Sequence, residues 1–312
     1  MRTQSKGFVL LSVVWVVALL TIIVLGFGHR AMLERRVAAH NMDRIQAQYL
    51  ARGATQRGMV ELRNKAALDR FMGRPGRTSF DQRWKNPPDL IEDEAIFLLG
   101  GEYEVEDEIC EYRIRDEEGL ISVNHAPREV LENLDGLGFR AVGEIMSRRQ
   151  STTGRGQAFM SIEEIRNLDG VDDRYWEGTR DRPGLRDVLT VWGTDGRINI
   201  NTAPAAVLEA IPELDGGDVE LILSAMGRDE DGLDAARGRG VRDIAVFLDE
   251  LNFSVDKRAS VERHGKVDSS FFTVTGVASQ RRGTIQAKSV AAVEIRDEDI
   301  TVLEWREDYG GA

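Results

Sequence analysis

Apolar residues run without a charged side chain from Phe8 to Phe27. A hydrocarbon core about 30 Å thick needs roughly 20 apolar helical residues at about 1.5 Å of rise each. The run therefore predicts a membrane-spanning helix over residues 8–28. Arg2 and Lys6 precede it, which predicts that the N-terminus stays in the cytoplasm.

Beyond this run, apolar residues recur at three- and four-residue spacing as far as about Arg70, so the pattern predicts that the same helix continues well past the bilayer. The spacing is not strict enough for the heptads of a coiled coil. Small residues gather along the helix instead, and they indicate close packing against a sheet. They are Ala47, Ala51, Gly53, Ala54 and Gly58.

Two later groups of apolar residues predict strands. The first group predicts a hairpin over residues 103–114 that turns near residues 107–108, and the second predicts a three-stranded meander over 271–277, 284–295 and 300–305. Glycines and prolines over 73–88 predict a loop before the hairpin. We expect the hairpin and the meander to form one antiparallel sheet on the long helix, with the chain between them as an insertion.

The chain between the two groups of strands contains an internal repeat, in which the segment from Gly119 aligns with the segment from Gly196. The first copy reads Gly-Leu-Ile-Ser-Val-Asn-His-Ala-Pro and the second Gly-Arg-Ile-Asn-Ile-Asn-Thr-Ala-Pro. Each copy predicts a short extended piece followed by a helix that starts at its proline. We expect Asn124 and Thr202 to cap these helices.

Short segments after these helices resemble the helix-hairpin-helix motif, whose glycines let backbone N–H groups approach a phosphate. The segment 134–138 fits this motif, and 168–172 matches half of it. The segment 211–215 places Glu213 and Asp215 where the glycines would be. With a formal net charge of -12 and a pI near 5.0, the sequence argues against nucleic acid as a partner and favours a protein.

An acidic, glycine-rich segment over 227–240 contains Asp229, Asp231 and Asp234. Their oxygens stand at a spacing that a hard cation such as calcium can use. The segment is not an EF-hand, because no glutamate stands where the bidentate ligand belongs. The alternative is a solvated acidic loop, and no motif of the chain requires a cofactor.

Enzymatic motifs are missing from the sequence, which has no Gly-x-Ser-x-Gly, no phosphate loop ending in Gly-Lys-Ser/Thr and no His-Glu-x-x-His. The four histidines lie in unrelated segments: His29, His40, His125 and His264. The single cysteine, Cys110, excludes a disulfide framework within the chain. We expect a protein that is not an enzyme, with Cys110 buried in a strand.

The tripeptide Lys6-Gly7-Phe8 opens the apolar helix with a basic residue, a glycine and an aromatic residue. This resembles type IV pilins and pseudopilins, whose leader a prepilin peptidase removes at the cytoplasmic face of the membrane. The resemblance implies cleavage between Gly7 and Phe8 and N-methylation of Phe8. A secretory signal and an ordinary signal anchor are the alternatives; the apolar run is long for a signal peptide, and no Ala-x-Ala-like site follows it.

Over nearly its whole length the chain resembles the K-type minor pseudopilins of the bacterial type II secretion system (general secretion pathway protein K, GspK). The resemblance lies in residues 7–8 with the apolar helix and in four further segments, 116–124, 159–165, 198–204 and 302–307. The first repeat departs from the family, because it has Ser-Val-Asn-His where the family usually shows Asn-x-Asn-Thr.

The resemblance implies an α+β, pilin-like fold. A long N-terminal helix, partly transmembrane, packs on an antiparallel sheet, and the insertion is a large all-α unit of the helix-hairpin-helix or SAM-like kind. The expected parts are a leader (1–7), the transmembrane part of the helix (8–28), the first part of the pilin-like domain (29–118), the inserted helical domain (119–267) and the C-terminal strands (268–312).

The resemblance also implies a function, which is to initiate the periplasmic pseudopilus at its tip and so support protein export across the outer membrane. Its implied partners are the I- and J-type minor pseudopilins, the major pseudopilin, the prepilin peptidase and the inner-membrane secretion platform. The implied location is the bacterial inner membrane, with the bulk of the chain in the periplasm. Two alternatives stay open: a membrane-anchored helix-hairpin-helix DNA receptor, and a minor pilin of another type IV pilus-like system.

Ser12 is the fifth residue of the mature chain that this cleavage would leave. Most pilins have a glutamate there, which can neutralise the N-terminal ammonium of the subunit ahead in the apolar core. A subunit with nothing ahead of it needs no such glutamate. Ser12 therefore favours a tip position, whereas the plain alternative is a tolerated small polar residue in an anchor helix.

Overall fold

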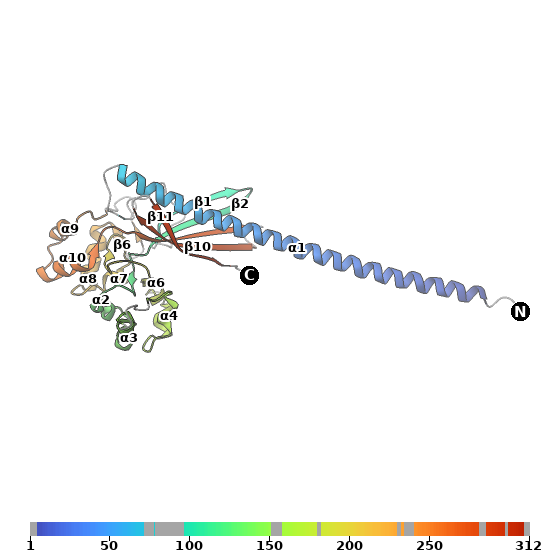
Figure 1. Cartoon of the computed structure of the whole chain (residues 1–312), viewed down its shortest axis with the longest axis horizontal. Helices are drawn as coiled ribbons and strands as arrows, with labels where there is room; N and C mark the ends of the chain where they lie inside the picture. Colours follow the sequence, from blue (N-terminus) through green and yellow to red (C-terminus); the bar gives the residue numbers. More distant parts are fainter. Residues whose placement is uncertain are drawn as a thin grey trace.

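The computed structural model describes residues 5–71, 78, 97–150, 158–179, 182–229, 232–233, 240–280, 285–296 and 299–308. Its longest element is α1 (Ser5–Phe71). The N-terminal half of α1 stands out from the rest of the molecule, and its C-terminal half lies across a sheet (Figure 1). The predicted extension of the helix beyond the apolar run is thus confirmed.

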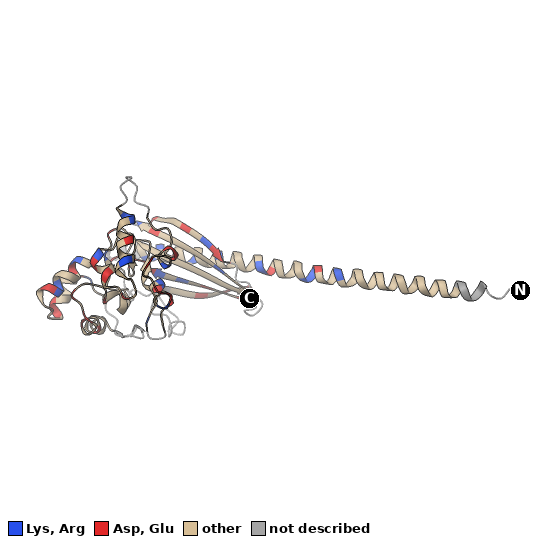
Figure 2. Ribbon diagram, turned by 90° about the horizontal axis from the view of Figure 1, so that it is seen from below, with Lys and Arg blue, Asp and Glu red and all other residues tan. Residues whose placement is uncertain are grey.

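The apolar half of α1 lies open to its surroundings. Its large hydrophobic side chains from Leu10 to Phe27 are each at least 43% exposed. After Lys6, the next charged residue of α1 is Arg30, and Figure 2 shows a long uncharged stretch of the helix before the first basic residues. In the part of the chain that is described, α1 is the helix long and apolar enough to cross a membrane. Thr21, within the run, donates its hydroxyl to the carbonyl of Val17 at 2.8 Å. This hydrogen bond satisfies the polar hydroxyl group within the helix.

Five strands form an antiparallel sheet in the order β1-β2-β9-β10-β11. They are β1 (Phe97–Val105), β2 (Glu108–Asp116), β9 (Phe271–Gln280), β10 (Ile285–Arg296) and β11 (Asp299–Asp308). Glu106 and Asp107 turn the first hairpin with φ of 51° and 70°, as a two-residue turn of the type favoured between twisted strands requires. The predicted hairpin and meander are both present, and the strands other than β10 are longer than the sequence pattern indicates.

The early hairpin and the late meander meet through β2 and β9. Cys110 of β2 pairs with Ala278, and Asp116 pairs with Phe272. The chain between these neighbouring strands, residues 117–270, therefore leaves and re-enters the sheet at one place. The predicted limits of the insertion, 119 and 267, fall just inside these strand ends.

Small residues bring α1 close to the sheet. Three alanines of α1 are buried at this contact: Ala47, Ala51 and Ala54. Gly276 in β9 is a point of close approach, because a Cβ there would lie 2.3 Å from the carbonyl oxygen of Ala51. Gly53 has no such role, since its Cβ would meet nothing nearer than 4.0 Å. Cys110 is buried beside the alanines, as predicted.

The chain between β2 and β9 folds into a helical unit with its own apolar core, at the end of the molecule away from the N-terminus (Figure 1). Its helices are α2 (Arg128–Asn133), α3 (Phe139–Arg149), α4 (Glu163–Arg166), α5 (Asp173–Glu177), α6 (Leu185–Val188), α7 (Ala205–Leu208), α8 (Gly216–Ala225), α9 (Ile244–Glu250) and α10 (Val255–His264). The unit is not purely helical, because short strand pairs join its parts.

These pairs show that the sequence repeat is also a structural repeat. In the first copy, β3 (Ile121–Ser122) leads into α2 and α3, and the chain returns in β4 (Leu189–Thr190), parallel to β3. In the second copy, β5 (Ile198–Asn199) leads into α7 and α8, and the chain returns in β8 (Gly265–Lys266), parallel to β5. The second copy also contains a small hairpin of β6 (Arg228–Asp229) and β7 (Gly232–Leu233).

Candidate assembly site

The residues predicted for processing and assembly lie at the outer end of α1. Gly7 and Phe8 are in its first turns, and Ser12 lies about one turn further along, with an exposed side chain. In the described part of the chain, no other element lies near that end (Figure 1). Cleavage between Gly7 and Phe8, methylation of Phe8 and the role of Ser12 stay predictions.

Asn124 closes the first repeat. Its Nδ2 donates to the carbonyls of Phe159 at 3.0 Å and Val191 at 2.8 Å, and its Oδ1 accepts the N–H of Phe159 at 2.8 Å. Phe159 opens one of the segments that carry the sequence resemblance, and Val191 follows β4 directly. The side-chain amide therefore ties the start of the repeat to its middle and its end.

Asn201 closes the second repeat in the same way. Its Oδ1 accepts the N–H of Val241 at 2.7 Å, and its Nδ2 donates to the carbonyls of Val241 at 3.0 Å and Val267 at 3.5 Å. The predicted capping role of Asn124 and Thr202 is wrong: α2 and α7 begin after a proline, and no side chain bonds at either cap. Both polar side chains reach distant parts of the chain instead.

Thr202 belongs to a buried junction between the sheet and the helical unit, which begins at Asp116, the last residue of β2. One oxygen of Asp116 accepts hydrogen bonds from Ser269 at 2.6 Å, Thr202 at 2.7 Å and Asn199 at 2.8 Å. The other oxygen accepts the N–H of Glu118 at 2.9 Å. Burial raises the pKa of Asp116, although these donors oppose the shift.

The next two residues of the junction bind the two return strands. Glu117 accepts the hydroxyl of Thr190 in β4 at 2.5 Å and pairs with Arg115 at 2.8 Å. Burial opposes its ionisation, but Arg115 and the hydroxyl donors outweigh burial and lower its pKa. Glu118 pairs with Lys266 of β8 at 2.6 Å, and burial raises its pKa against the effect of Lys266. Three consecutive acids thus fix both repeats to the sheet.

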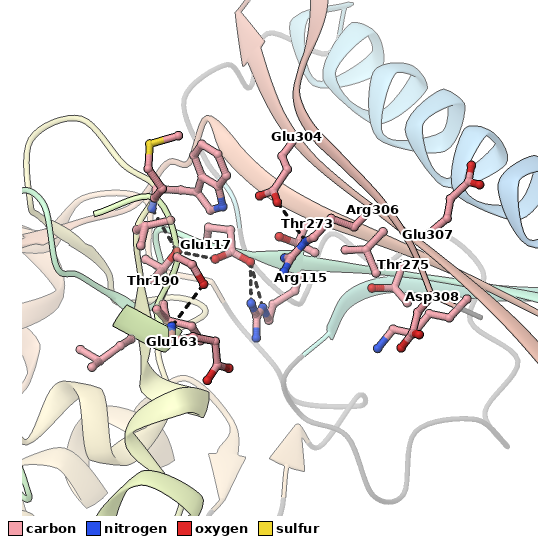
Figure 3. Close-up of a pocket in the computed structure, with 18 residues that line it drawn as sticks. Arg115, Glu117, Glu163, Thr190, Thr273, Thr275, Glu304, Arg306, Glu307 and Asp308 are labelled. Carbon is pink, nitrogen blue, oxygen red and sulfur yellow. Dashed lines mark hydrogen bonds and ion pairs between the residues drawn. The ribbon is translucent and has the colours of Figure 1, made fainter. Parts of the chain in front are cut away.

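A cleft of about 780 Å³ opens beside this junction, between the helical unit and the sheet face opposite α1 (Figure 3). Glu117 and Arg115 lie in its middle (Figure 3), and on the side of the sheet Arg306 of β11 pairs with Glu304 at 3.1 Å. The cleft follows the seam between the two units. We assign it no reaction, because these charged side chains are held by one another.

Three loops of the helical unit each join two helices: α2 to α3, α4 to α5 and α7 to α8. Each turns through a residue with positive φ, at Gly136 (85°), Gly170 (99°) and Glu213 (68°). Leu137 and Val171 form an antiparallel bridge, so the loops at 134–138 and 168–172 face each other as a pair. Each of the three segments therefore turns the chain between two helices, as the sequence predicts, while their likeness to the helix-hairpin-helix motif stays a resemblance.

Carboxylates occupy the phosphate-binding position of the hairpin at 211–215. Asp215 caps α8 by accepting the N–H of Asp218 at 3.0 Å, and Asp218 in turn accepts the N–H of Asp215 at 2.9 Å. The bond from Asp218 is the main cause of the lowered pKa of Asp215, so this side chain stays anionic. Lys257 lies 2.6 Å from Asp218 and is therefore already paired. A phosphate at this helix start would meet negative charge.

The predicted cation ligands are not brought together by any described contact. Asp229 belongs to β6, whereas Asp231 and Asp234 lie outside the described residues. Within the residues that are described, no group of three or more histidine, cysteine or acidic side chains is arranged to hold a metal ion. Calcium binding by this segment stays a prediction, which melting curves with calcium and with chelator would test.

A serine and a histidine that sequence motifs did not single out lie in contact. Ser122 Oγ is 3.2 Å from His125 Nδ1. Ser122 is only 6% exposed, and the contact joins residues of one turn. Burial lowers the pKa of His125, and nearby Arg149 adds to this effect. The pair is therefore built like a local turn contact, without the access to substrate that a nucleophile needs.

No family model and no curated protein matches the chain. Among solved structures, it resembles a chain of the crystal structure of the GspK–GspI–GspJ complex from the enterotoxigenic Escherichia coli type 2 secretion system, with a TM-score of 0.61. The match covers 88% of this chain and 99% of that chain at 15% sequence identity. The protein therefore has the fold of a component of that complex, which confirms the predicted α+β, pilin-like architecture.

Proposed function

We propose that this protein is a K-type minor pseudopilin of a type II secretion system. The observation that carries the proposal is the fold match, which spans 99% of a chain of the GspK–GspI–GspJ complex. The K type is favoured because three of the segments that resemble K-type sequences build the helical unit. They contain Asn124, Phe159 and Asn201, which close its repeats.

The proposed partners are the I- and J-type minor pseudopilins, with which the neighbour's complex is formed. Their contact surface on this chain is the exposed face of α1 that follows the membrane run and points away from the sheet. Apolar side chains are exposed there on a soluble segment, and such surfaces mark contacts with other proteins. They include Val37, Met42, Ile45 and Tyr49, each at least 47% exposed. The major pseudopilin and the secretion platform are proposed as later partners.

The proposed place is the tip of the pseudopilus, where the subunit initiates assembly. The helical unit supports this, because it adds bulk at the end of the molecule away from the N-terminus (Figure 1). A further subunit stacked beyond that end would meet this bulk. Ser12 agrees with an end position, since it supplies no carboxylate to a subunit ahead.

Photo-crosslinking in cells tests the position. A photoreactive residue replaces Tyr49, 69% exposed on α1, or Val255, 80% exposed on α10. We expect position 49 to crosslink to I- or J-type subunits and position 255 to crosslink to no pseudopilin. Crosslinks to the major pseudopilin from both positions would contradict a tip subunit. A failure of position 49 to reach any pseudopilin would contradict the proposed function itself.

The proposed location is the inner membrane, with residues 1–7 cytoplasmic before cleavage and the sheet in the periplasm. Mass spectrometry of the mature chain tests processing, and we expect N-methylated Phe8 as its first residue. A cysteine in place of Val255 tests orientation, because Cys110 is buried and leaves the new thiol as the reactive one. We expect a membrane-impermeant maleimide to label the new cysteine from the periplasm. Labelling only after the inner membrane is opened would show the opposite orientation.

A further inference from the structure

Three arginines follow the apolar run of α1 and form what we call the arginine collar: Arg30, Arg35 and Arg36. All three are exposed, and they precede Ala47, the first residue of α1 that is buried against the sheet. Glu34 is the only acid between residues 28 and 42, and it pairs with Arg30 at 3.1 Å. The collar is thus a positive zone in a chain whose formal net charge is -12.

The collar points to all sides of the helix. At about 100° per residue, Arg30, Arg35 and Arg36 are separated around the axis by about 140°, 100° and 120°. A protein packed against one side of α1 can contact only part of such a ring. Lipid headgroups, in contrast, surround a helix that crosses a membrane.

The backbone of the collar begins at the depth of the headgroups and continues just beyond it. Arg30 is about 4.5 Å and Arg36 about 13.5 Å beyond Phe27 along the helix, at about 1.5 Å per residue. The headgroup layer on each side of the hydrocarbon is about 5–8 Å thick. Helical side chains tilt toward the N-terminus, so the long side chains of Arg35 and Arg36 extend back toward this layer.

Arg35 and Arg36 are not neutralised within the described part of the chain, where no ion pair involves either of them. A guanidinium group forms paired hydrogen bonds with a phosphate. We propose that the arginine collar binds the phosphates of phospholipids, preferentially anionic ones, in the leaflet that faces the sheet, and so fixes the depth of α1. The proposal requires only that α1 spans a membrane and does not depend on the assembly role.

The test uses the full chain in vesicles of phosphatidylcholine, alone or mixed with phosphatidylglycerol. A nitroxide on Met32→Cys reports depth through its collisions with oxygen and with a water-soluble nickel complex. We expect the depth of this label to differ between the two lipids for the native collar and to be the same in both for Arg35→Gln/Arg36→Gln. Arg242→Gln/Arg263→Gln removes the same charge from exposed sites on the helical unit and should behave as the native chain does.

The lipids that stay bound when the protein is purified from the mixed vesicles give an independent measurement of lipid preference. We expect the enrichment of phosphatidylglycerol over phosphatidylcholine to fall about fivefold for each arginine removed from the collar, and not to change in the control. Equal depth and equal lipid enrichment for the native chain and the collar variant would overturn the proposal. A depth that responds to added I- and J-type subunits but not to lipid would also overturn it and assign the collar to a protein partner.

Discussion

Asn124 and Asn201, which align in the sequence repeat, form the same three hydrogen bonds in the two halves of the helical unit. Each side-chain oxygen accepts the N–H of one residue, Phe159 or Val241. Each side-chain NH2 group donates to the carbonyl of that same residue and to the carbonyl of the residue that directly follows a return strand. A side-chain amide supplies both an acceptor and two donors, which a carboxylate of the same shape does not. The asparagine in each copy is therefore explained by closure of the repeat.

Replacing Asn201 by alanine should lower the free energy of unfolding by about 3 kcal/mol. The change leaves the N–H and carbonyl of Val241 unpaired at a buried site, and each unsatisfied group costs about 1–3 kcal/mol. Asn124→Ala should cost less, because Asn124 is less buried than Asn201. Urea unfolding of the full chain in detergent measures both. Asn167→Ala, at an exposed asparagine, is the control, and an equal loss there would refute the closure argument.

Gly276→Ala should separate α1 from the sheet. The added Cβ would lie 2.3 Å from the carbonyl oxygen of Ala51 and 2.5 Å from the backbone nitrogen of Thr55, and backbone atoms of a packed helix cannot step aside. We expect a loss of about 3 kcal/mol, at the upper end for overpacking. The control is Gly53→Ala on α1, where the new methyl group meets nothing nearer than 4.0 Å. That variant should gain up to about 1 kcal/mol of helix stability.

Stability should fall as the pH drops below about 6.5, the pKa of an unfolded histidine. His264 is 3% exposed, and burial lowers its pKa in the folded protein despite the Glu129 carboxylate 3.0 Å away. Above pH 6.5 the ring is neutral in both states and its contribution is fully present. Below pH 6.5 the histidine takes up a proton in the unfolded chain before it does so in the folded protein. Its contribution to the free energy of unfolding is therefore lost as the pH falls from 6.5 to the lower pKa of the folded state.

Urea midpoints between about pH 7.5 and 5.5 measure the slope of stability against pH. His264→Gln should reduce it, and adding His125→Gln should reduce it further, because burial also lowers the pKa of His125. A slope that is unchanged in the double variant would mean that other groups cause it.

Glu213→Gly should stabilise the protein by about 1 kcal/mol. Glu213 has φ of 68°, a left-handed conformation that costs a residue with a side chain about 1–2 kcal/mol and that glycine adopts readily. Glu209→Gly provides the comparison, because Glu209 has φ of -61° and gains nothing from glycine. Thermal melting of the two variants side by side should move their midpoints in opposite directions.

The full chain should have no measurable affinity for duplex DNA at physiological salt. Glu213 and the ionised Asp215 occupy the helix start that would face a phosphate, and the nearby Lys257 already contacts Asp218. A gel-shift assay tests this. Micromolar binding that weakens with salt would favour the alternative of a membrane-anchored DNA receptor.

The elements with strong local patterns could be predicted from the sequence. The helical spacing of apolar residues predicted the course of α1. The alternation of apolar and polar residues predicted both groups of strands, because one face of the sheet is buried. The repeat was visible because its two copies share residues. The roles of Asn124 and Thr202 were predicted wrongly because a polar residue just before a helix usually caps it. Their partners Val191 and Asp116 lie far away in the sequence, where no local pattern connects them.

The junction was hidden for a related reason. Three acids after a strand suggest a solvated face, yet Asp116, Glu117 and Glu118 are each less than 5% exposed. Burial of this kind depends on donors from several distant segments, such as Thr190 and Lys266. The run of acids at the end of a strand was a signal in the sequence, but only the fold supplies its partners.

The insertion between paired strands also dictates an order of folding. β2 and β9 cannot pair until residues 117–270 have brought their ends together, and closing so long a loop in an unfolded chain costs entropy before any strand contact forms. A folded helical unit lowers that cost, because it holds the ends of the two strands close together, at the place where Glu117 donates its N–H to the carbonyl of Phe271 at 3.0 Å in the complete fold. β9 and β10, which hold the alanine face of α1, are also made late in synthesis. The first helix of the chain is thus the last to be covered.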